Sequence, residues 1–320
     1  MKTISGAHKS GIGRYFGAVV LSLALSATYC IAQGAVPPDA ARAAGYSVNT
    51  FHSSLQPPSI AGANATPSSQ WFRTRFFSYP PLSLTSIKFD TPGLTLVDTG
   101  YRNYGIATAG PVPGPKKWAG VAFGGGAYIE ARIKFDPETV ARNAKGWPSF
   151  WSMAIEHLAG LPTEQWPGQV QGFKHFIEAD FFEYDLLSHG VARNYFGGTL
   201  HDWAGVYKGT CANAAFCNFQ SSGVAMPMPE DTDFSQYHRY GFLWIPATES
   251  RRGSAEFYFD GQRVGRQMKW TRFVDQTPLP SKSSAWAFGI IDLNHLVLIL
   301  GTGERQPMSV QSVDVWQTDD

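Results

Sequence analysis

Three carboxylates lie within one short hydrophobic stretch of the chain, at Glu178, Asp180 and Glu183. Their neighbours are large and apolar and include Phe181 and Phe182. A carboxylate that loses its hydration must be paired, hydrogen-bonded or protonated, so folding alone rarely selects such a stretch. Paired acids are the standard apparatus for cleaving a glycosidic bond, one as nucleophile and one as general acid/base. Spacing alone leaves two other interpretations open, a solvated strand face and a cation site.

The residues that flank these acids favour a β-strand over a helix, because Phe and Ile are enriched in strands. Alternation along a regular strand directs Glu178 and Asp180 to one face and Glu183 to the other. One extra residue, a β-bulge at Phe181 and Phe182, returns Glu183 to the first face. The sequence therefore predicts a bulged strand that carries three acids into one cleft.

The composition of the 320-residue chain suits an aromatic-rich β protein, with 14% aromatic and only 16% charged residues. Soluble domains average about 25% charged residues. A formal net charge of +1 gives no electrostatic argument for binding nucleic acid or an anionic membrane surface. The sequence contains no dinucleotide fingerprint, serine-hydrolase elbow or zinc-protease motif, and we expect no required cofactor.

Short alternating apolar segments, separated by Gly and Pro, run from about residue 87 to the end of the chain. Asp260-Gly261 directly follows one such segment and is a strong hairpin signal. Only residues 137–144 have a helical pattern. Many strands without helical repeats predict an all-β fold, a β-sandwich or jelly roll. We assign residues 71–320 to a single domain, preceded by an extended leader over residues 33–70.

Residues 1–32 have the features of an export signal, because basic residues precede an apolar run and Ala32 offers a cleavage point. The apolar run is shorter than the about 20 residues that a membrane span needs. We expect a secreted or periplasmic protein without a membrane span, and Cys30 leaves a lipid anchor as the alternative. In an oxidising compartment Cys211 and Cys217, separated by five residues, favour a local disulfide over a metal site.

Six further blocks of sequence accompany the acids in order along the chain, at residues 127–134, 146–151, 198–203, 237–244, 257–261 and 310–316. Together they resemble glycoside hydrolase family 16, which includes laminarinases, lichenases, agarases and carrageenases. The hallmark of that family is Glu-x-Asp-x-x-Glu in its bulged form, and Glu178, Asp180 and Glu183 match all three acidic positions. The resemblance covers about residues 85–316.

The resemblance implies a concanavalin A-like jelly-roll β-sandwich of two curved antiparallel sheets, with a polysaccharide bound on the concave face. It also implies retaining endo-hydrolysis of a β-linked polysaccharide. In that mechanism Glu178 attacks the anomeric carbon and Asp180 assists it, while Glu183 protonates the leaving oxygen and then activates water.

The resemblance also suggests substrate-binding residues. Trp147, Trp151 and Trp203 are candidates for stacking on sugar faces, with core packing as the alternative, and His201 is a candidate for a polar contact beside the reacting ring. Relatives carry a structural calcium on the convex face, but no Asp-rich loop identifies a metal site in this sequence. We expect a monomer whose partner is the polysaccharide.

One position departs from the family pattern, because Ile177 stands where a Gly usually precedes the first Glu. Its bulk predicts a narrower cleft or a shifted strand. Three alternatives to a hydrolase stay open. They are a lectin-like jelly roll that binds glycan without cutting it, a transglycosylase that shares the covalent intermediate, and a polysaccharide lyase. A lyase usually needs Tyr or His bases beside Arg or Gln, and no such cluster accompanies the acids.

Overall fold

The computed structural model describes residues 36–61, 66, 68–73, 81–100, 105–111, 118–143, 145–158, 175–186, 192–204, 218–273 and 287–319. The export signal, Cys30, Cys211 and Cys217 lie outside these described residues, so the export and the disulfide stay predictions. The described residues all belong to one compact unit. No helix among them is long and apolar enough to cross a membrane.

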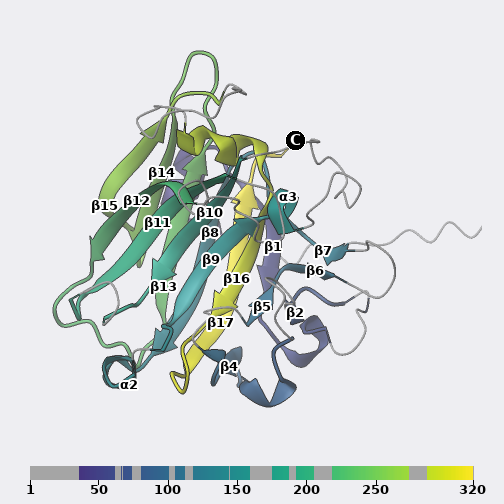
Figure 1. Ribbon diagram of the computed structural model, residues 1–320, viewed down its shortest axis with the longest axis vertical. Coiled ribbons are helices and arrows are strands. Elements are labelled where there is room, and N and C mark those ends of the chain that lie inside the picture. Colours follow the sequence, from purple (N-terminus) through teal and green to yellow (C-terminus); the bar gives the residue numbers. More distant parts are fainter. Residues whose placement is uncertain are drawn as a thin grey trace, which may run out of the picture. The chain divides into compact units, whose positions relative to one another are not determined.

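Two antiparallel sheets account for most of the described chain, which confirms the predicted all-β architecture (Figure 1). The eight-stranded sheet has the order β15-β14-β13-β8-β17-β4-β3, and β1 pairs with β17. Its strands are β1 (Val48–Ser53), β3 (Ile87–Phe89), β4 (Leu94–Leu96), β8 (Ala127–Phe135), β13 (His238–Ile245), β14 (Gly253–Phe259), β15 (Gln262–Trp270) and β17 (Met308–Gln317).

The seven-stranded sheet has the order β12-β11-β10-β9-β16-β5-β2. Its strands are β2 (Phe72–Arg73), β5 (Ile106–Ala107), β9 (Ser149–Ala154), β10 (His175–Glu183), β11 (Tyr195–Ala204), β12 (Asn218–Pro227) and β16 (Leu296–Gly301). A separate two-stranded sheet pairs β6 (Ala109–Pro111) with β7 (Trp118–Gly120).

Aromatic side chains from both large sheets interlock in the core. Phe181 of β10 lies 4.6 Å from Phe242 of β13, and Phe182 lies 4.1 Å from Tyr240, measured between ring centroids. Such close aromatic pairs stabilise a core beyond the area that they bury. Because side chains alternate along a strand, this packing also decides which residues of β10 face away from the core.

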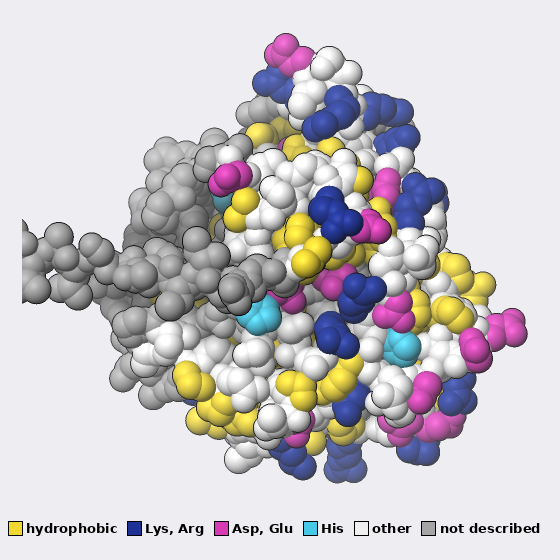
Figure 2. Space-filling model, turned by 180° about the vertical axis from the view of Figure 1, so that it is seen from behind, with side chains coloured by type: hydrophobic (Ala, Val, Ile, Leu, Met, Phe, Trp, Pro, Cys, Tyr) yellow, Lys and Arg dark blue, Asp and Glu magenta, His cyan; other side chains and the backbone are white. Residues whose placement is uncertain are grey.

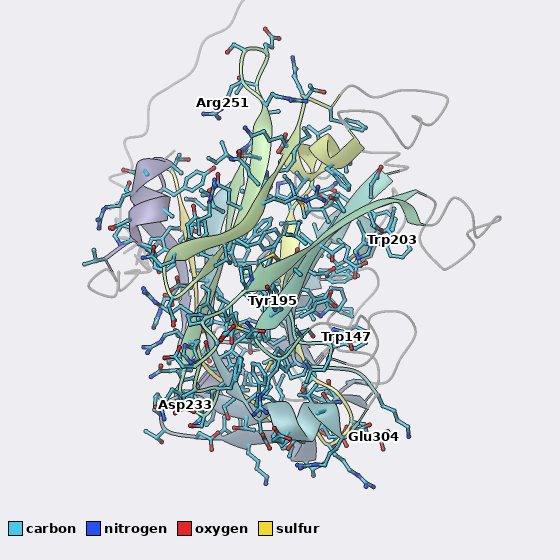
Figure 3. The ribbon with its side chains drawn as sticks, turned by 90° about the vertical axis from the view of Figure 1, so that its left-hand side faces the viewer. Trp147, Tyr195, Trp203, Asp233, Arg251 and Glu304 are labelled. Carbon is cyan, nitrogen blue, oxygen red and sulfur yellow. The ribbon has the colours of Figure 1, made fainter. Side chains whose placement is uncertain are left out.

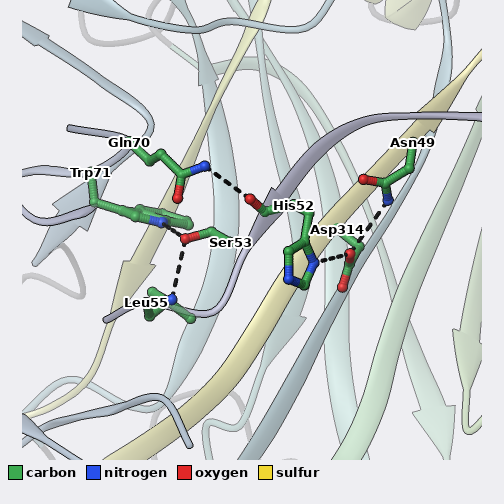
Figure 4. Close-up of polar contacts among 7 residues, drawn as sticks. All are labelled: Asn49, His52, Ser53, Leu55, Gln70, Trp71 and Asp314. Atoms are coloured by element: carbon green, nitrogen blue, oxygen red, sulfur yellow. Dashed lines mark hydrogen bonds and ion pairs between the residues drawn. The ribbon is translucent and has the colours of Figure 1, made fainter. Parts of the chain in front are cut away.

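The N-terminal segment differs from the predicted extended leader, because β1 is a strand of the eight-stranded sheet. Figure 4 shows its contacts: His52 Nδ1 lies 2.7 Å from Asp314 Oδ1, and Trp71 Nε1 donates to Ser53 Oγ at 2.8 Å. Phe51 fixes the strand by burying its ring in the core. The domain therefore begins upstream of residue 71.

Among the described residues, helices are few and short: α1 (Asp39–Ala43), α2 (Pro137–Ala141), α3 (Ile155–Leu158), η1 (Pro57–Ser59), η3 (Leu84–Ser86) and η5 (Ala287–Leu293). The predicted helix near residue 137 is α2, where the side chain of Asp136 accepts a hydrogen bond from the backbone N–H of Glu138. The predicted hairpin is also confirmed, since Asp260 and Gly261 join β14 to β15 with φ values of 47° and 82°.

Basic and acidic side chains are interspersed across the middle of the face seen in Figure 2. This mixture agrees with the near-neutral net charge of the sequence. A polyanion binds best to a continuous basic surface, and the middle of this face offers none.

Candidate active site

Strand β10 carries all three acids and departs from regular pairing between them. Against β9, Asp180 lies opposite Trp151 and the next pair is Phe182 with Phe150, so Phe181 is an extra residue. Against β11, the register also shifts between Asp180 and Glu183. The predicted β-bulge is therefore confirmed.

The bulge directs two consecutive phenylalanines into the core, where Phe181 and Phe182 are both fully buried. As a result Glu178, Asp180 and Glu183 share the opposite face of the seven-stranded sheet, which we call the acid-bearing face. Glu178 and Glu183 are partly exposed, whereas Asp180 is only 3% exposed. The structure thus brings together the three acids that the sequence singled out.

Ile177, the departure from the family pattern, does not narrow this face. Its side chain is fully buried in the core, and its backbone N–H donates to Asn294 Oδ1 at 2.9 Å. Phe176 is the neighbour that reaches the acid-bearing face, where its ring stacks on Trp203 with centroids 6.4 Å apart and planes 8° apart. The expectation of a narrower cleft was wrong, because alternation along β10 turns Ile177 inward.

Two tryptophans hold the outer two acids through their ring N–H groups. Trp203 of β11 donates from Nε1 to Glu178 Oε2 at 2.7 Å, and Trp147, just before β9, donates from Nε1 to Glu183 Oε1 at 2.8 Å. Figure 3 shows both tryptophans on the same side of the ribbon. The sequence predicted them as surfaces for stacking on sugars, and the structure shows that they orient the carboxyl groups.

The middle acid has a different partner, since His201 Nε2 lies 3.2 Å from Asp180 Oδ2. The other ring nitrogen, His201 Nδ1, lies 2.7 Å from Ser221 Oγ on β12. His201 was predicted to make a polar contact beside the reacting sugar ring, and that contact stays a prediction; the contact in the structure is with Asp180. Ser221 was missed, because only the pairing of β12 with β11 brings it to His201 across 20 positions of sequence.

Burial raises the pKa values of the three acids, and the charge of Asp180 adds to this rise at Glu178 and Glu183. Burial, together with the charge of Asp180, raises the pKa of Glu178 to about 8 and that of Glu183 to about 8. Burial raises the pKa of Asp180 to about 8 as well. Because neighbouring acids titrate as a set, the site holds fewer than three negative charges at neutral pH. Among the described residues, no group of three His, Cys, Asp or Glu side chains is arranged to hold a metal ion.

The strands on the two sides of β10 present different residues on the acid-bearing face. On β9 and β16, apart from Ser149 and Gly301 at one end, the residues are large, apolar and at most 7% exposed, and they pack with α3: Trp151, Met153, Val297 and Ile299. On β11 and β12, apart from Trp203, they are small or polar and partly to fully exposed: Gly197, Thr199, His201, Ser221, Gly223 and Ala225. We call these the filled half and the open half. Trp151, in the filled half, is buried in an apolar cluster, so it has the packing role that was the alternative to stacking on a sugar.

Comparison with known proteins gives a likeness in structure only. No family model matches the chain, and no curated protein sequence does. Among solved structures, an endo-1,3-beta-glucanase from Streptomyces sioyaensis matches with a TM-score of 0.52 and 16% identity, over 90% of this chain and all of that one. The chain therefore shares its fold with a β-glucanase.

A weaker match is the exoplasmic/lumenal domain of VIP36 with bound Ca²⁺ and Man3GlcNAc, with a TM-score of 0.36 and 8% identity over 73% of this chain and 82% of that one. The glucanase match confirms the jelly-roll fold that the family resemblance implied. At 16% identity it establishes the fold alone.

Proposed function

We propose that this chain is an exported, retaining, endo-acting glycoside hydrolase that cleaves a β-linked polysaccharide by double displacement. The observation that carries the proposal is the bulge in β10, which brings Glu178, Asp180 and Glu183 to one face of the sheet. Each of the three carboxyl groups also has a hydrogen-bonding partner on that face. A strand that served only the fold has no need to gather three acids, because their desolvation is costly.

In the first half of the reaction, Glu178 attacks the anomeric carbon and the bond to the leaving oxygen breaks. Glu183 gives its proton to that oxygen, so the leaving sugar departs neutral. In the second half, Glu183 takes a proton from water as the water oxygen displaces Glu178. Two inversions retain the β configuration and restore both glutamates.

The raised pKa of Glu183 suits its role as the general acid. A pKa near 8 keeps Glu183 protonated at neutral pH, as a general acid requires. Glu178 must instead be ionised, although burial raises its pKa to about 8 as well. The hydrogen bond from Trp203 lowers that pKa and so favours the carboxylate. A proton on Asp180 removes the adjacent charge that raises the pKa of Glu178. Asp180 therefore assists the nucleophile by carrying a proton itself, so that Glu178 can be ionised.

A substrate panel tests the proposal. The full chain is incubated with β-glucans, galactans and xyloglucan, and new reducing ends are measured. A β-1,3-glucan comes first, because the structurally similar enzyme is named for that linkage. We expect new ends from at least one glycan, with the β anomer appearing first in the ¹H NMR spectrum. An initial α signal contradicts double displacement.

The same panel separates the alternatives. Retention of a glycan without new ends identifies a lectin-like binding protein. Transfer of the cleaved chain to a sugar in place of water identifies a transglycosylase, which uses the same covalent intermediate.

A further inference from the structure

A line of hydrogen bonds crosses three neighbouring strands and ends at the most buried of the acids. It begins at Ser221 on the edge strand β12, passes through His201 on β11 and reaches Asp180 on β10. Ser221 is exposed, the side chain of His201 is 23% exposed and that of Asp180 is 4% exposed. The line therefore runs from the open edge of the sheet to the centre of the candidate site.

The imidazole ring of His201 is held at both nitrogens. Ser221 is its direct partner in the register of β11 and β12, and the hydroxyl lies 2.7 Å from Nδ1. Trp203 lies beside the ring, with centroids 5.8 Å apart. If the ring turned over about its Cβ–Cγ bond, it would present a carbon to Asp180 in place of Nε2. The hydrogen bond to Ser221 opposes that turn.

A hydroxyl suits the outer end of this line because it can donate or accept a hydrogen bond. When Asp180 is ionised, the Nε2–H of His201 donates to it and Nδ1 accepts from Ser221. When Asp180 is protonated, its O–H donates to Nε2 and the Nδ1–H donates to Ser221 Oγ. The same three residues thus satisfy both protonation states of Asp180.

We propose that Ser221 is a positioning residue, which holds His201 with Nε2 toward Asp180 and so supports the proton that Asp180 carries beside Glu178. This inference rests on the proposed function, because it assigns Asp180 a role in the reaction. In this role Ser221 acts through His201.

The next residue of β12 provides a matched control. Ser222 points to the other face of the sheet by alternation, and its Oγ accepts a hydrogen bond from Arg266 Nη2 at 3.0 Å. Ser221→Ala and Ser222→Ala each remove one hydroxyl from the same strand. Only the first removes it from the line to Asp180, and Ser221→Thr keeps a hydroxyl there.

Kinetics on the best glycan of the panel give the first test. We expect Ser221→Ala to lower kcat about ten-fold, the rate equivalent of one hydrogen bond, with KM unchanged and a shifted pH profile of kcat. Ser221→Thr should recover most of the rate, and Ser222→Ala should match the wild type. An unchanged kcat and pH profile in Ser221→Ala, or an equal loss in Ser222→Ala, overturns the inference.

A second readout needs no substrate. The ¹⁵N chemical shifts of the His201 ring nitrogens report which nitrogen carries the proton, and Ser221→Ala should change them while Ser222→Ala does not. Unchanged shifts in Ser221→Ala overturn the role of Ser221. A wild-type protein that cleaves no glycan contradicts the proposed function instead, so the two failures are distinguished.

Discussion

The filled half and the open half of the acid-bearing face flank the same strand, yet opposite kinds of residue build them. In the filled half, Trp151 and Ile299 are paired in the register and buried in an apolar cluster that includes residues of α3. In the open half, Gly197 lies opposite Glu183 and pairs with the exposed Ala225 on its other side. Buried apolar area stabilises a fold, whereas a sugar needs accessible space beside polar groups.

Gly197, in the open half, shows what this difference means. Glycine in a strand interior costs about 0.5–1 kcal/mol relative to alanine, and it often marks a close approach of a ligand. At Gly197 a Cβ atom would meet only the backbone oxygen of Glu183 at 3.6 Å and its Cβ at 3.8 Å. The fold itself leaves room for a side chain there. Under the proposed function, stability and sugar access are thus served on opposite sides of β10.

The largest effect is expected at the strand where the two halves meet. Glu178→Gln and Glu183→Gln should each lower kcat about 1,000-fold or more, because each removes a group that acts on the reacting atoms. Both variants should fold, since Gln has the size of Glu and its amide oxygen still accepts from Trp203 or Trp147. Initial rates on the best glycan and a thermal melt are the measurements.

A buried acid on the other sheet provides the control for these variants. Glu130 is 5% exposed and accepts a hydrogen bond from the hydroxyl of Tyr128 at 3.1 Å, as the catalytic candidates accept from indoles. Glu130→Gln should leave kcat within about two-fold of the wild type. Substantial turnover in Glu178→Gln or Glu183→Gln would refute their assigned roles.

The sequence predicted the features that depend on local pattern. Alternation and the Phe181-Phe182 pair were enough to predict the bulge, since only an extra residue places Glu183 beside Asp180. The same rule applied to Ile177 would have turned it into the core, and expecting it in the cleft ignored that alternation. The strand at residues 48–53 was missed because Phe51 is its one side chain in the main core.

The hydrogen bonds of the site could not be predicted from local sequence pattern. Trp147 and Glu183 are 36 positions apart, and Trp203 and Glu178 are 25 apart. Strand pairing brings each pair together, but only the rotamer of the indole decides whether its N–H or its ring face meets the acid. Stacking on a sugar and bonding to an acid look the same in the sequence.

The filled half should respond to mutation through stability. Ile299→Ala removes buried methyl and methylene groups from a fully buried side chain and should lower the free energy of unfolding by about 3 kcal/mol. The rate per folded molecule should stay within about three-fold of the wild type, because no sugar is expected there. Urea unfolding and initial rates are the measurements. Ile299→Val, with an expected loss of about 1 kcal/mol, provides a milder step.

A large loss of rate in Ile299→Ala without a loss of stability would mean that the filled half opens to take sugar. The division between the two halves would then be wrong.

The open half should respond in the opposite way. Gly197→Val places a branched side chain beside Glu183 and should lower kcat/KM on a polysaccharide about 10- to 100-fold. The free energy of unfolding should change by less than about 1 kcal/mol, because the new atoms have room and Val favours strands. Steady-state kinetics and urea unfolding on the same preparation separate the two effects.

The neighbouring glycine gives the matched control for this prediction. Gly198 faces the core, where a Cβ atom would overlap Met226 and Phe257. Gly198→Ala should therefore destabilise the protein by about 1–3 kcal/mol through overpacking while each folded molecule keeps most of its activity. If Gly197→Val instead behaves like Gly198→Ala, the glycine at 197 serves the fold and the open half loses its main support.

The smallest expected effect concerns the free energy of unfolding, which falls when Glu183 ionises. Burial and the charge of Asp180 raise the pKa of Glu183 from 4.5 to about 8, so the folded state binds a proton more tightly than the unfolded state. Stability from this group is therefore complete below pH 4.5 and is lost as the pH rises toward 8. Glu183→Gln removes this titration, so the variant should become more stable than the wild type as the pH rises through that window. The difference in the free energy of unfolding should reach about 1–2 kcal/mol, because partial exposure of Glu183 and the coupled titration of the three acids reduce the effect.

Thermal melts of both proteins at matched ionic strength from pH 4 to 9 measure this difference. The exposed Glu230 provides the control, because Glu230→Gln should leave the pH dependence of the melting temperature unchanged. A difference between Glu183→Gln and the wild type that stays constant with pH would show that Glu183 ionises normally. The general acid would then lose its proton at neutral pH, which would contradict the role assigned to Glu183.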